Sequence, residues 1–350
     1  MHDDAGPSIR GEGSAVSTET NRPATSENAT DRPPSGDEAQ GITIAARTQG
    51  QLIRRRFFRH RAAMGGMITL LLVIVLAFTS IGFGPIPGWW DKSYLSTGSL
   101  VNDGDPTLSL VPAFLGGDGI RLGEHPFGQD DVGKDYFALV MRGAQQSLII
   151  AFVIGIVSTV VGAVVGALAG YFRGRTEGVL MRLTDVVISI PTLVFAAILA
   201  AAAGRAGIVV LGVAIGLVIW TGLARLVRGE FLALREKEFV EAARAAGTKP
   251  SRIIFKHMMP NAIGVIIVSA TLAVAVGILL ETALSYLGLG VRPPDVSLGS
   301  LVSLYETAMT TRPSLFWWPG IFIVIIALSV NFIGDGLRDA FDPRQTRVRE

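Results

Sequence analysis

Six long apolar stretches alternate with polar segments along this chain. They run over Ala62–Gly84, Ser147–Gly170, about Val186–Ala203, about Gly207–Leu223, about Ala262–Glu281 and about Phe316–Gly334. The hydrocarbon core of a bilayer is roughly 30 Å thick, and about 20 mostly apolar helical residues are needed to cross it. Only the short turn Gly204–Gly207 separates the third stretch from the fourth. The pattern predicts an all-α integral membrane protein with six transmembrane helices.

Composition supports a membrane protein and removes several kinds of chemistry. Hydrophobic residues make up 49% of the 350 residues and charged residues only 17%, whereas a soluble domain carries about 25% charged residues. The chain has no cysteine, which excludes disulfides, thiolate metal sites and thiol catalysis. A net charge of +2 gives no support for a nucleic-acid partner.

Basic residues between the apolar stretches predict the orientation in the membrane, because cytoplasmic loops carry an excess of lysine and arginine. The segment directly before the first stretch holds Arg54, Arg55, Arg56, Arg59 and Arg61. The loop after the fourth stretch is the most basic, with Arg225, Arg228, Arg235, Lys237, Arg244, Lys249, Arg252 and Lys256. We therefore expect both termini to be cytoplasmic. The outer boundary then holds four tryptophans, Trp89, Trp90, Trp317 and Trp318, whose indole rings favour the interface.

This topology divides the chain into five parts. Residues 1–50 are rich in Ser, Thr, Pro, Gly and acids, and we expect a disordered cytoplasmic tail. Residues 51–84 hold the basic flank and the first transmembrane helix, and residues 85–143 form an extracytoplasmic segment. Residues 144–335 form a core domain with five transmembrane helices and a cytoplasmic loop, 225–261. Residues 336–350 form a cytoplasmic C-terminal tail.

Small residues and one proline indicate how the helices pack. Gly162, Gly166 and Gly170 form a row on one helix face, which allows a neighbouring helix to approach closely. A chance row in a glycine-rich protein is an equally good explanation. Pro191 is expected to kink the third helix near its cytoplasmic end, as a gating feature or as tolerated geometry.

The polar stretch EAARAAGTKPSRIIFKHMMPN, Glu241–Asn261, lies between two apolar stretches. Good helix formers, Gly247 at a helix end and Pro250 at the start of the next helix predict a helix, a break and a second helix. One face of the first helix carries, by i, i+3, i+4 spacing, Phe239, Ala242, Ala243 and Ala246. Such a stiff element can transmit force to the spans beside it, although an ordinary solvated loop helix shows the same pattern.

The same stretch resembles the EAA loop of ABC-importer membrane subunits. That pattern is EAA, three residues, Gly, nine residues and then IxLP. The matching positions are Glu241, Ala242, Ala243, Gly247 and Pro260, while His257 and Met259 replace the usual Ile and Leu. In that family the short helix docks in a groove of a cytoplasmic ATPase, so the resemblance implies a docking role for these residues together with Phe239.

Further stretches resemble the dipeptide/oligopeptide/nickel-type branch of these permeases. HPFGQDDVGKDYF is similar to the family segment HPxGTDxxGRD, with Gln129 and Lys134 as departures. GAQQSL, DVVISIP, ALSYLGLGVRPP and NFIGDGLRDAFDPR follow in family order, up to about Arg344. The resemblance implies the ABC type I importer permease fold. It also implies a gating or structural role for the motif positions Gly128, Asp130, Gly133, Asp135, Pro191, Glu281, Gly288 and Gly290.

Acids near the spans are the remaining candidates. Glu281 lies close to the outer end of the fifth stretch, and acids embedded in a membrane are costly and suggest function. We expect water at that boundary to solvate it, with a structural or gate-forming role. Asp185 and Asp335 lie near the inner boundary, where we expect helix caps or salt bridges.

The chain has no GxxxxGK[ST] phosphate loop, so it is expected to be a non-catalytic subunit without a cofactor of its own. The resemblance places ATP and Mg in a partner ATPase. It also implies a homologous second permease in a heterodimer, two ATPase subunits or domains, an extracytoplasmic solute-binding protein and a multi-pass position among the lipids of a bacterial cytoplasmic membrane. Import of di- or oligopeptides is favoured, with nickel chelates or glutathione-like solutes as alternatives.

Two other classes of protein fit the sequence less well. An ion-coupled secondary transporter needs polar or charged groups in the middle of its spans. An intramembrane enzyme needs a nucleophile with a base, or metal ligands. The apolar stretches contain no histidine and almost no charge away from their ends.

Overall fold

A computed structural model describes residues 49–109, 119, 121–203 and 206–342. All of these belong to one compact unit, Arg47–Glu350. The predicted tail 1–50 lies outside the described residues except for its last two, as does most of the predicted tail 336–350 and part of the turn at 204–207.

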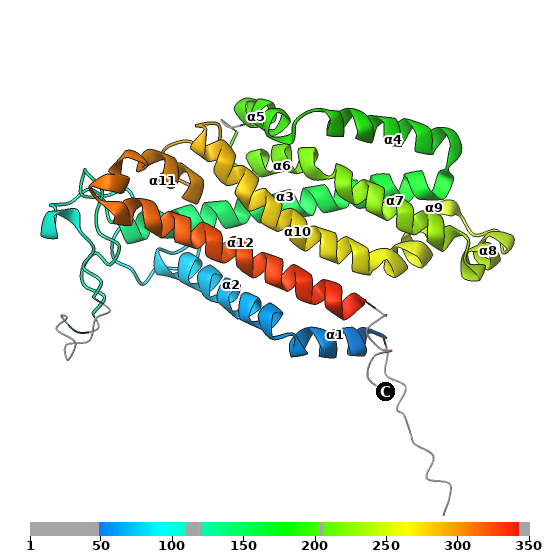
Figure 1. Ribbon diagram of the computed structural model, residues 1–350, viewed down its shortest axis with the longest axis horizontal. Helices are drawn as coiled ribbons and strands as arrows, with labels where there is room; N and C mark the ends of the chain where they lie inside the picture. The colour runs from blue at the N-terminus through cyan, green and yellow to red at the C-terminus, as the bar shows by residue number, and fades with distance from the viewer. Residues whose placement is uncertain (1–48, 110–118, 120, 204–205, 343–350) are drawn as a thin grey trace, which may run out of the picture. The chain divides into compact units, whose positions relative to one another are not determined.

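The described residues are mostly helical and contain no β-strand beyond four isolated bridges. Figure 1 shows the main helices, which are α1 (Gln49–Arg59), α2 (Arg61–Ser80), α3 (Tyr136–Phe172), α4 (Gly174–Ser189), α5 (Thr192–Ala203), α6 (Ile208–Ile219), α7 (Thr221–Arg235), α8 (Glu238–Ala245), α9 (Pro250–Arg252), α10 (Met259–Tyr286), α11 (Leu298–Leu304) and α12 (Pro313–Phe341). A π-helical turn, Ile253–Met258, joins α9 to α10. The all-α prediction is confirmed.

Four described helices are long and apolar enough to cross a membrane, namely α2, α3, the run Pro250–Tyr286 and α12. Two bent pairs pass the same test together: α4 with α5, bent by 91°, and α6 with α7, bent by 51°. The predicted number of six is reached if each bent pair is one span. The third predicted span, Val186–Ala203, crosses the first of these bends.

Pro191 lies in the break between α4 and α5, so its effect is larger than a kink within one helix. Proline has no N–H to donate, and its ring disfavours helical geometry in the residue before it. Accordingly, Ile190 has extended backbone angles (φ −85°, ψ 130°) and ends α4.

The glycine row of α3 packs directly on α7, as the sequence predicted. A Cβ atom added to Gly162 would lie 2.7 Å from the backbone oxygen of Trp220, and one on Gly166 would lie 2.4 Å from that of Ala224. Gly170 lies against Phe231 in the same way. Without side chains at these positions the two backbones approach closely, and dispersion forces between them stabilise the pair where lipid gives no hydrophobic drive.

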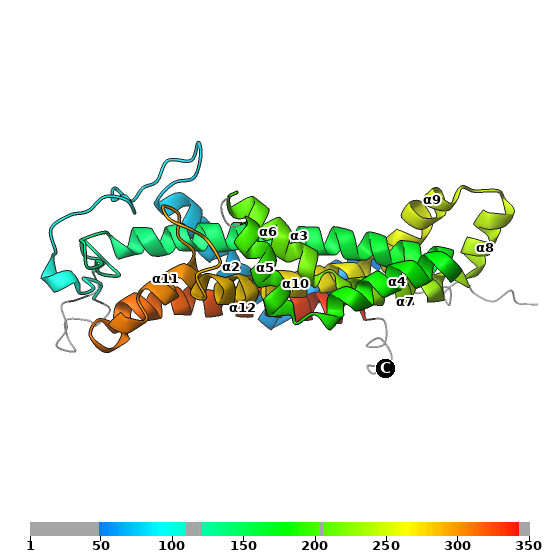
Figure 2. The ribbon, with the colours of Figure 1, turned by 90° about the horizontal axis from the view of Figure 1, so that it is seen from above.

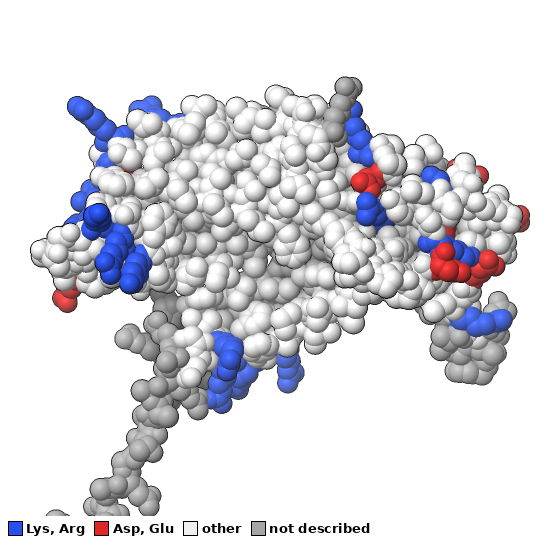
Figure 3. Space-filling view, turned by 180° about the vertical axis from the view of Figure 1, so that it is seen from behind, with Lys and Arg blue, Asp and Glu red and all other residues white. Residues whose placement is uncertain are grey.

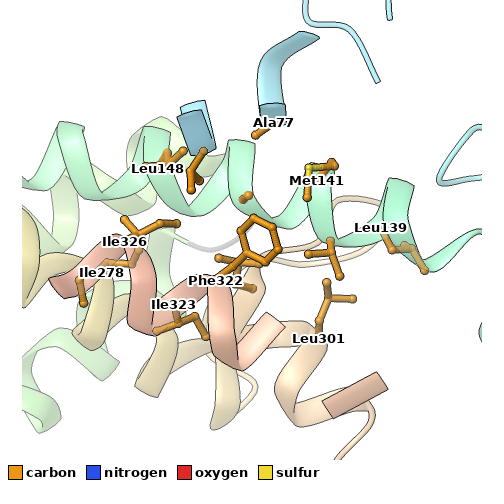
Figure 4. Packing of buried hydrophobic residues seen from close by; sticks show 14 of the residues in the cluster. Ala77, Leu139, Met141, Leu148, Ile278, Leu301, Phe322, Ile323 and Ile326 are labelled. Carbon is orange, nitrogen blue, oxygen red and sulfur yellow. The ribbon is translucent and has the colours of Figure 1, made fainter. Parts of the chain in front are cut away.

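A large apolar core joins the long helices at the end opposite α8. Its side chains come from α2, α3, α10, α11 and α12, including Ala77, Met141, Leu148, Ile278, Leu301 and Phe322 (Figure 4). Both ribbon views place α11 and the described residues 81–109 and 121–135 at this end of the long helices, and α8 and α9 at the other (Figure 2). The predicted docking helix α8 and the motif segment around Gly128–Asp135 therefore lie at opposite ends of the long helices.

Candidate functional site

The short helix α8 is held to the protein mainly through its one buried residue, and the Arg244 guanidinium also lies over the Tyr171 ring at 5.2 Å. Val240 is fully buried and belongs to a cluster with Phe231, Leu234, Ile253 and Ile254. An eight-residue helix is only marginally stable alone in water, so its position depends on this packing. Sequence reasoning did not single out Val240, although it is the one β-branched residue in the α8 sequence EFVEAARA.

The outer surface of α8 carries most of the predicted docking residues. Phe239 is 40% exposed, although it is a large apolar side chain, and Glu241 and Ala242 are also exposed. Ala243 is only half-buried because it faces partly toward the cluster around Val240. Ala246 is also exposed, so on the predicted shared face only Ala243 turns partly inward.

The break after α8 has the geometry predicted for it. The N–H of Gly247 donates to the backbone oxygen of Arg244 at 2.9 Å, and the N–H of Thr248 donates to that of Ala243 at 3.0 Å. This pair of bonds is a Schellman C-cap, which needs a left-handed residue after the cap, and Gly247 has φ +71°. Pro250 then begins α9, as expected.

The end of the motif continues into a candidate membrane span. Pro260 lies at the start of α10 and is exposed, on a different helix from the other docking residues. Met258 is fully buried within the π-helical turn. Because Pro250–Tyr286 forms one 37-residue helical run, the end of the motif is continuous with that span.

At the other end of the protein, Asp135 organises the start of α3. Its carboxylate accepts hydrogen bonds from the Ala138 N–H at 2.7 Å, from Trp90 Nε1 at 3.0 Å and from His125 Nδ1 at 2.7 Å. It is therefore the N-cap of α3 and also binds the preceding segment to that helix. The Trp90 contact could not be inferred from the sequence, because 45 residues separate the partners.

Asp130 has a similar role in the turn before α3. It accepts from the backbone N–H groups of Val132 and Lys134 and from the hydroxyl of Tyr305. Burial, followed by the nearby Asp130 carboxylate, raises the pKa of Tyr305, so this hydroxyl remains a donor. The neighbouring motif glycines have positive φ angles, +86° at Gly128 and +78° at Gly133. These contacts fix the conformation of the segment before α3.

Next to Asp135 lies a small pocket of about 210 Å³ with ionisable groups at its wall. Lys92 Nζ lies 3.0 Å from Glu124 and 3.1 Å from His125 Nε2. The hydrogen bond and charge of Lys92 lower the pKa of Glu124. The described residues contain no group of three or more acids and histidines arranged to hold a metal ion.

The expectation that water solvates Glu281 is wrong. Its side chain is fully buried, and the carboxylate accepts hydrogen bonds from Ser147 of α3 at 3.0 Å and from Ser285 of α10 at 2.6 Å. Ser147 in turn accepts from the Leu298 N–H, the first residue of α11. Three helices close over this carboxylate, which water at the membrane boundary cannot reach.

The two glycines after α10 shape the turn that leads toward α11. Gly288 has φ +75° and completes a C-cap in which Leu289 N–H donates to Leu284 O at 2.8 Å. Gly290 packs against Ser285, with no room for a Cβ atom. Asp185, farther away on α4, forms the expected salt bridge, with Arg225 at 2.6 Å.

Comparison with known proteins gives the family. Residues 162–347 match the family model described as binding-protein-dependent transport system inner membrane component. The chain belongs to this family. Residues 48–88 match a second model, the N-terminal TM domain of oligopeptide transport permease C. The chain is therefore an inner-membrane permease subunit of an ABC importer and not an enzyme, as the sequence predicted.

Curated relatives cover most of the chain. Oligopeptide transport system permease protein OppC of Escherichia coli K12 is 38% identical over 87% of this chain and 95% of that protein. The proteins of the same name from Haemophilus influenzae and Bacillus subtilis are 34% and 35% identical, over 88% and 83% of this chain and 93% and 88% of theirs. A solved structure of the MetNI methionine ABC transporter is similar with a TM-score of 0.48 and 21% identity, over 58% of this chain and 97% of that one.

Proposed function

We propose that this chain forms half of the translocation pathway of an ATP-driven oligopeptide importer, and that a separate ATPase docks on α8. The exposed motif surface of α8, packed through Val240 onto the helical turn that leads into a membrane span, carries this proposal. A rigid connection of this kind converts a displacement at the docking site into a movement of packed helices.

The distribution of charge supports cytoplasmic termini and a cytoplasmic α8. In the space-filling view a wide band separates two charged ends, and it is free of charged residues except for basic side chains at its lower edge (Figure 3). The end that carries α7 and α8 is predominantly basic on this face, and the end that carries α11 has acidic and basic residues together. The excess of arginine and lysine on one side of an apolar band is typical of the cytoplasmic side.

Oligopeptides are the proposed solutes because the curated relatives are named for their transport and match over nearly their whole length. Nickel chelates and glutathione-like molecules remain alternatives. Within this proposal the chain pairs with a homologous second permease, two ATPase subunits that bind ATP and Mg, and an extracytoplasmic solute-binding protein. The same proposal gives the chain no cofactor of its own.

The docking assignment is tested with a pair of charge reversals. Glu241 and Glu236 are both exposed, and Glu236 makes only a 3.9 Å contact with Arg173. Glu241→Arg is expected to lower ATP-driven peptide uptake at least tenfold and to reduce co-purification of the ATPase, while membrane insertion stays normal. Glu236→Arg serves as the matched control and should retain uptake. Normal uptake by Glu241→Arg would refute docking on α8.

A further inference from the structure

The helix α1 has two faces that differ in how their charges are satisfied. On the inner face, Arg56 donates to the backbone oxygen of Asp342 at 3.1 Å, and His60 lies 3.4 Å from Asp339, both beside α12. The half-buried Phe57 is on the same face. This face is therefore already occupied by the C-terminal part of α12.

The outer face of α1 is basic and has no counter-charge. Arg54, Arg55 and Arg59 are exposed, and none forms an ion pair or hydrogen bond within the described part of the chain. Residues 49–63 contain no Asp or Glu. Basic side chains gather where α1 meets α2, and no acidic side chain is visible beside them (Figure 3).

Apolar side chains lie among these arginines. Phe58 is 54% exposed and lies one turn along the helix from Arg54 and Arg55, and Leu52 is 38% exposed. With Gln51 and the two arginines, Phe58 lines a surface hollow of about 410 Å³. An exposed aromatic ring between unpaired guanidinium groups suits a surface whose polar layer is anionic and whose next layer is apolar.

The position of α1 along the chain places it at the level of lipid headgroups. The candidate span α2 begins at Arg61, only two residues after α1 ends, with His60 capping α2 through the Ala63 N–H. A helix joined so closely to the start of a span lies at the boundary between hydrocarbon and water, on whichever side of the membrane that is.

We propose that the outer face of α1 binds anionic phospholipid headgroups, with Arg54, Arg55 and Arg59 contacting phosphate and Phe58 inserted among the acyl chains beneath. Guanidinium groups form paired hydrogen bonds with phosphate oxygens. Lipid bound in this way holds α1 against the membrane while α12 holds its other face. The proposal is independent of the transported solute and of ATPase docking.

The test measures lipid preference of the full-length chain. The purified protein is exchanged into mixed phosphatidylglycerol and phosphatidylcholine, and the lipids retained on it are counted by native mass spectrometry. Each interfacial arginine strengthens binding to an anionic surface by roughly fivefold. The combined variant Arg54→Gln, Arg55→Gln, Arg59→Gln should therefore lower the preference for phosphatidylglycerol by at least tenfold, and the native preference should weaken as salt rises.

Two further variants make the outcome specific. Lys237→Gln, Lys249→Gln, Arg252→Gln removes the same charge from exposed residues of the α8–α9 region and should keep the native preference. Phe58→Ala keeps every charge and should reduce total lipid retention. An unchanged preference in the α1 variant, or an equal loss in the control, would overturn the proposal. The proposal would also be overturned if inorganic phosphate alone displaced the retained phosphatidylglycerol from the protein, because the ligand of this surface would then be a free anion.

Discussion

The contact between α3 and α7 allows a sharp prediction at Gly166. A methyl group there would lie 2.4 Å from the backbone oxygen of Ala224 and 2.8 Å from Val227 Cβ, whereas ordinary contacts begin at 3.4 Å. Gly166→Ala therefore forces the two helices apart by roughly 1 Å at this point, the difference between 3.4 and 2.4 Å. Gly229 in α7 is the matched control, because it is exposed and a Cβ there would meet nothing within 4 Å.

The expected free energies have opposite signs at the two positions. Replacing glycine by alanine inside a helix gains about 0.5–1 kcal/mol from lower backbone entropy in the unfolded chain. At Gly229 nothing opposes that gain. At Gly166 overpacking costs about 1–3 kcal/mol, and separating the helices also loses dispersion contacts along the row. Gly166→Ala should thus be less stable by about 1–2 kcal/mol, and Gly229→Ala more stable by about 0.5–1 kcal/mol.

Thermal unfolding of the purified chain in one detergent measures both variants against the native protein, with size-exclusion chromatography reporting the folded fraction. One kcal/mol corresponds to about 2–4 °C in Tm for domains of comparable size. The reasoning is refuted if Gly166→Ala unfolds at the native temperature or above it, because the backbones would then not be in contact at this position.

Four other changes have defined outcomes. Val240→Asn buries an amide in the α8 cluster at a cost of about 2–3 kcal/mol and should release α8, seen as faster hydrogen exchange in residues 238–246 with α3 unaffected. Glu281→Leu leaves the buried Ser147 and Ser285 hydroxyls without their acceptor and should lower Tm by more than Glu281→Gln, which keeps an acceptor oxygen; equal Tm values would contradict this. Lys92 lowers the folded-state pKa of Glu124 below its ordinary value of 4.5. The contact between the two side chains therefore stabilises the fold above pH 4.5, and this stabilisation is lost as the pH falls through the folded-state pKa. Glu124→Gln should remove the loss of stability at acid pH that comes from this contact. Since the chain has no cysteine, Ala246→Cys and Ser96→Cys test the topology: an impermeant maleimide added outside intact cells should label only Ser96→Cys.

Patterns within a few turns of a helix could be predicted from the sequence. The glycine row identified the close face of α3, and Gly247 with Pro250 identified the break after α8. Both signals depend on the shape of the backbone within one helix or turn, so they do not require knowing which segment packs against it. The family motifs likewise indicated the permease, because their spacing is a property of the chain alone.

Contacts between distant segments could not be predicted. Whether water reaches Glu281 depends on Ser147, 134 residues earlier, and on α11 folding back over α10. The bends at Pro191 and Trp220 divide two apolar stretches whose hydropathy is continuous, so apolar periodicity gave no indication of the angle at either break. The sequence marks Val240 as the β-branched residue of α8, but it does not indicate that Ile253 and Ile254 are its partners.

If α8 docks an ATPase as proposed, the helical run Pro250–Tyr286 would act mechanically as a lever. At 1.5 Å per residue, its 37 residues span about 55 Å. A rotation of about 10° around its midpoint would move each end by roughly 5 Å, comparable to one helical turn. The α8 break lies at one end of this lever and the buried Glu281 carboxylate close to the other. A tilt imposed at one face of the membrane would therefore strain the hydrogen bond between Glu281 and Ser147 of α3 near the opposite face, with no signal passed from residue to residue in between.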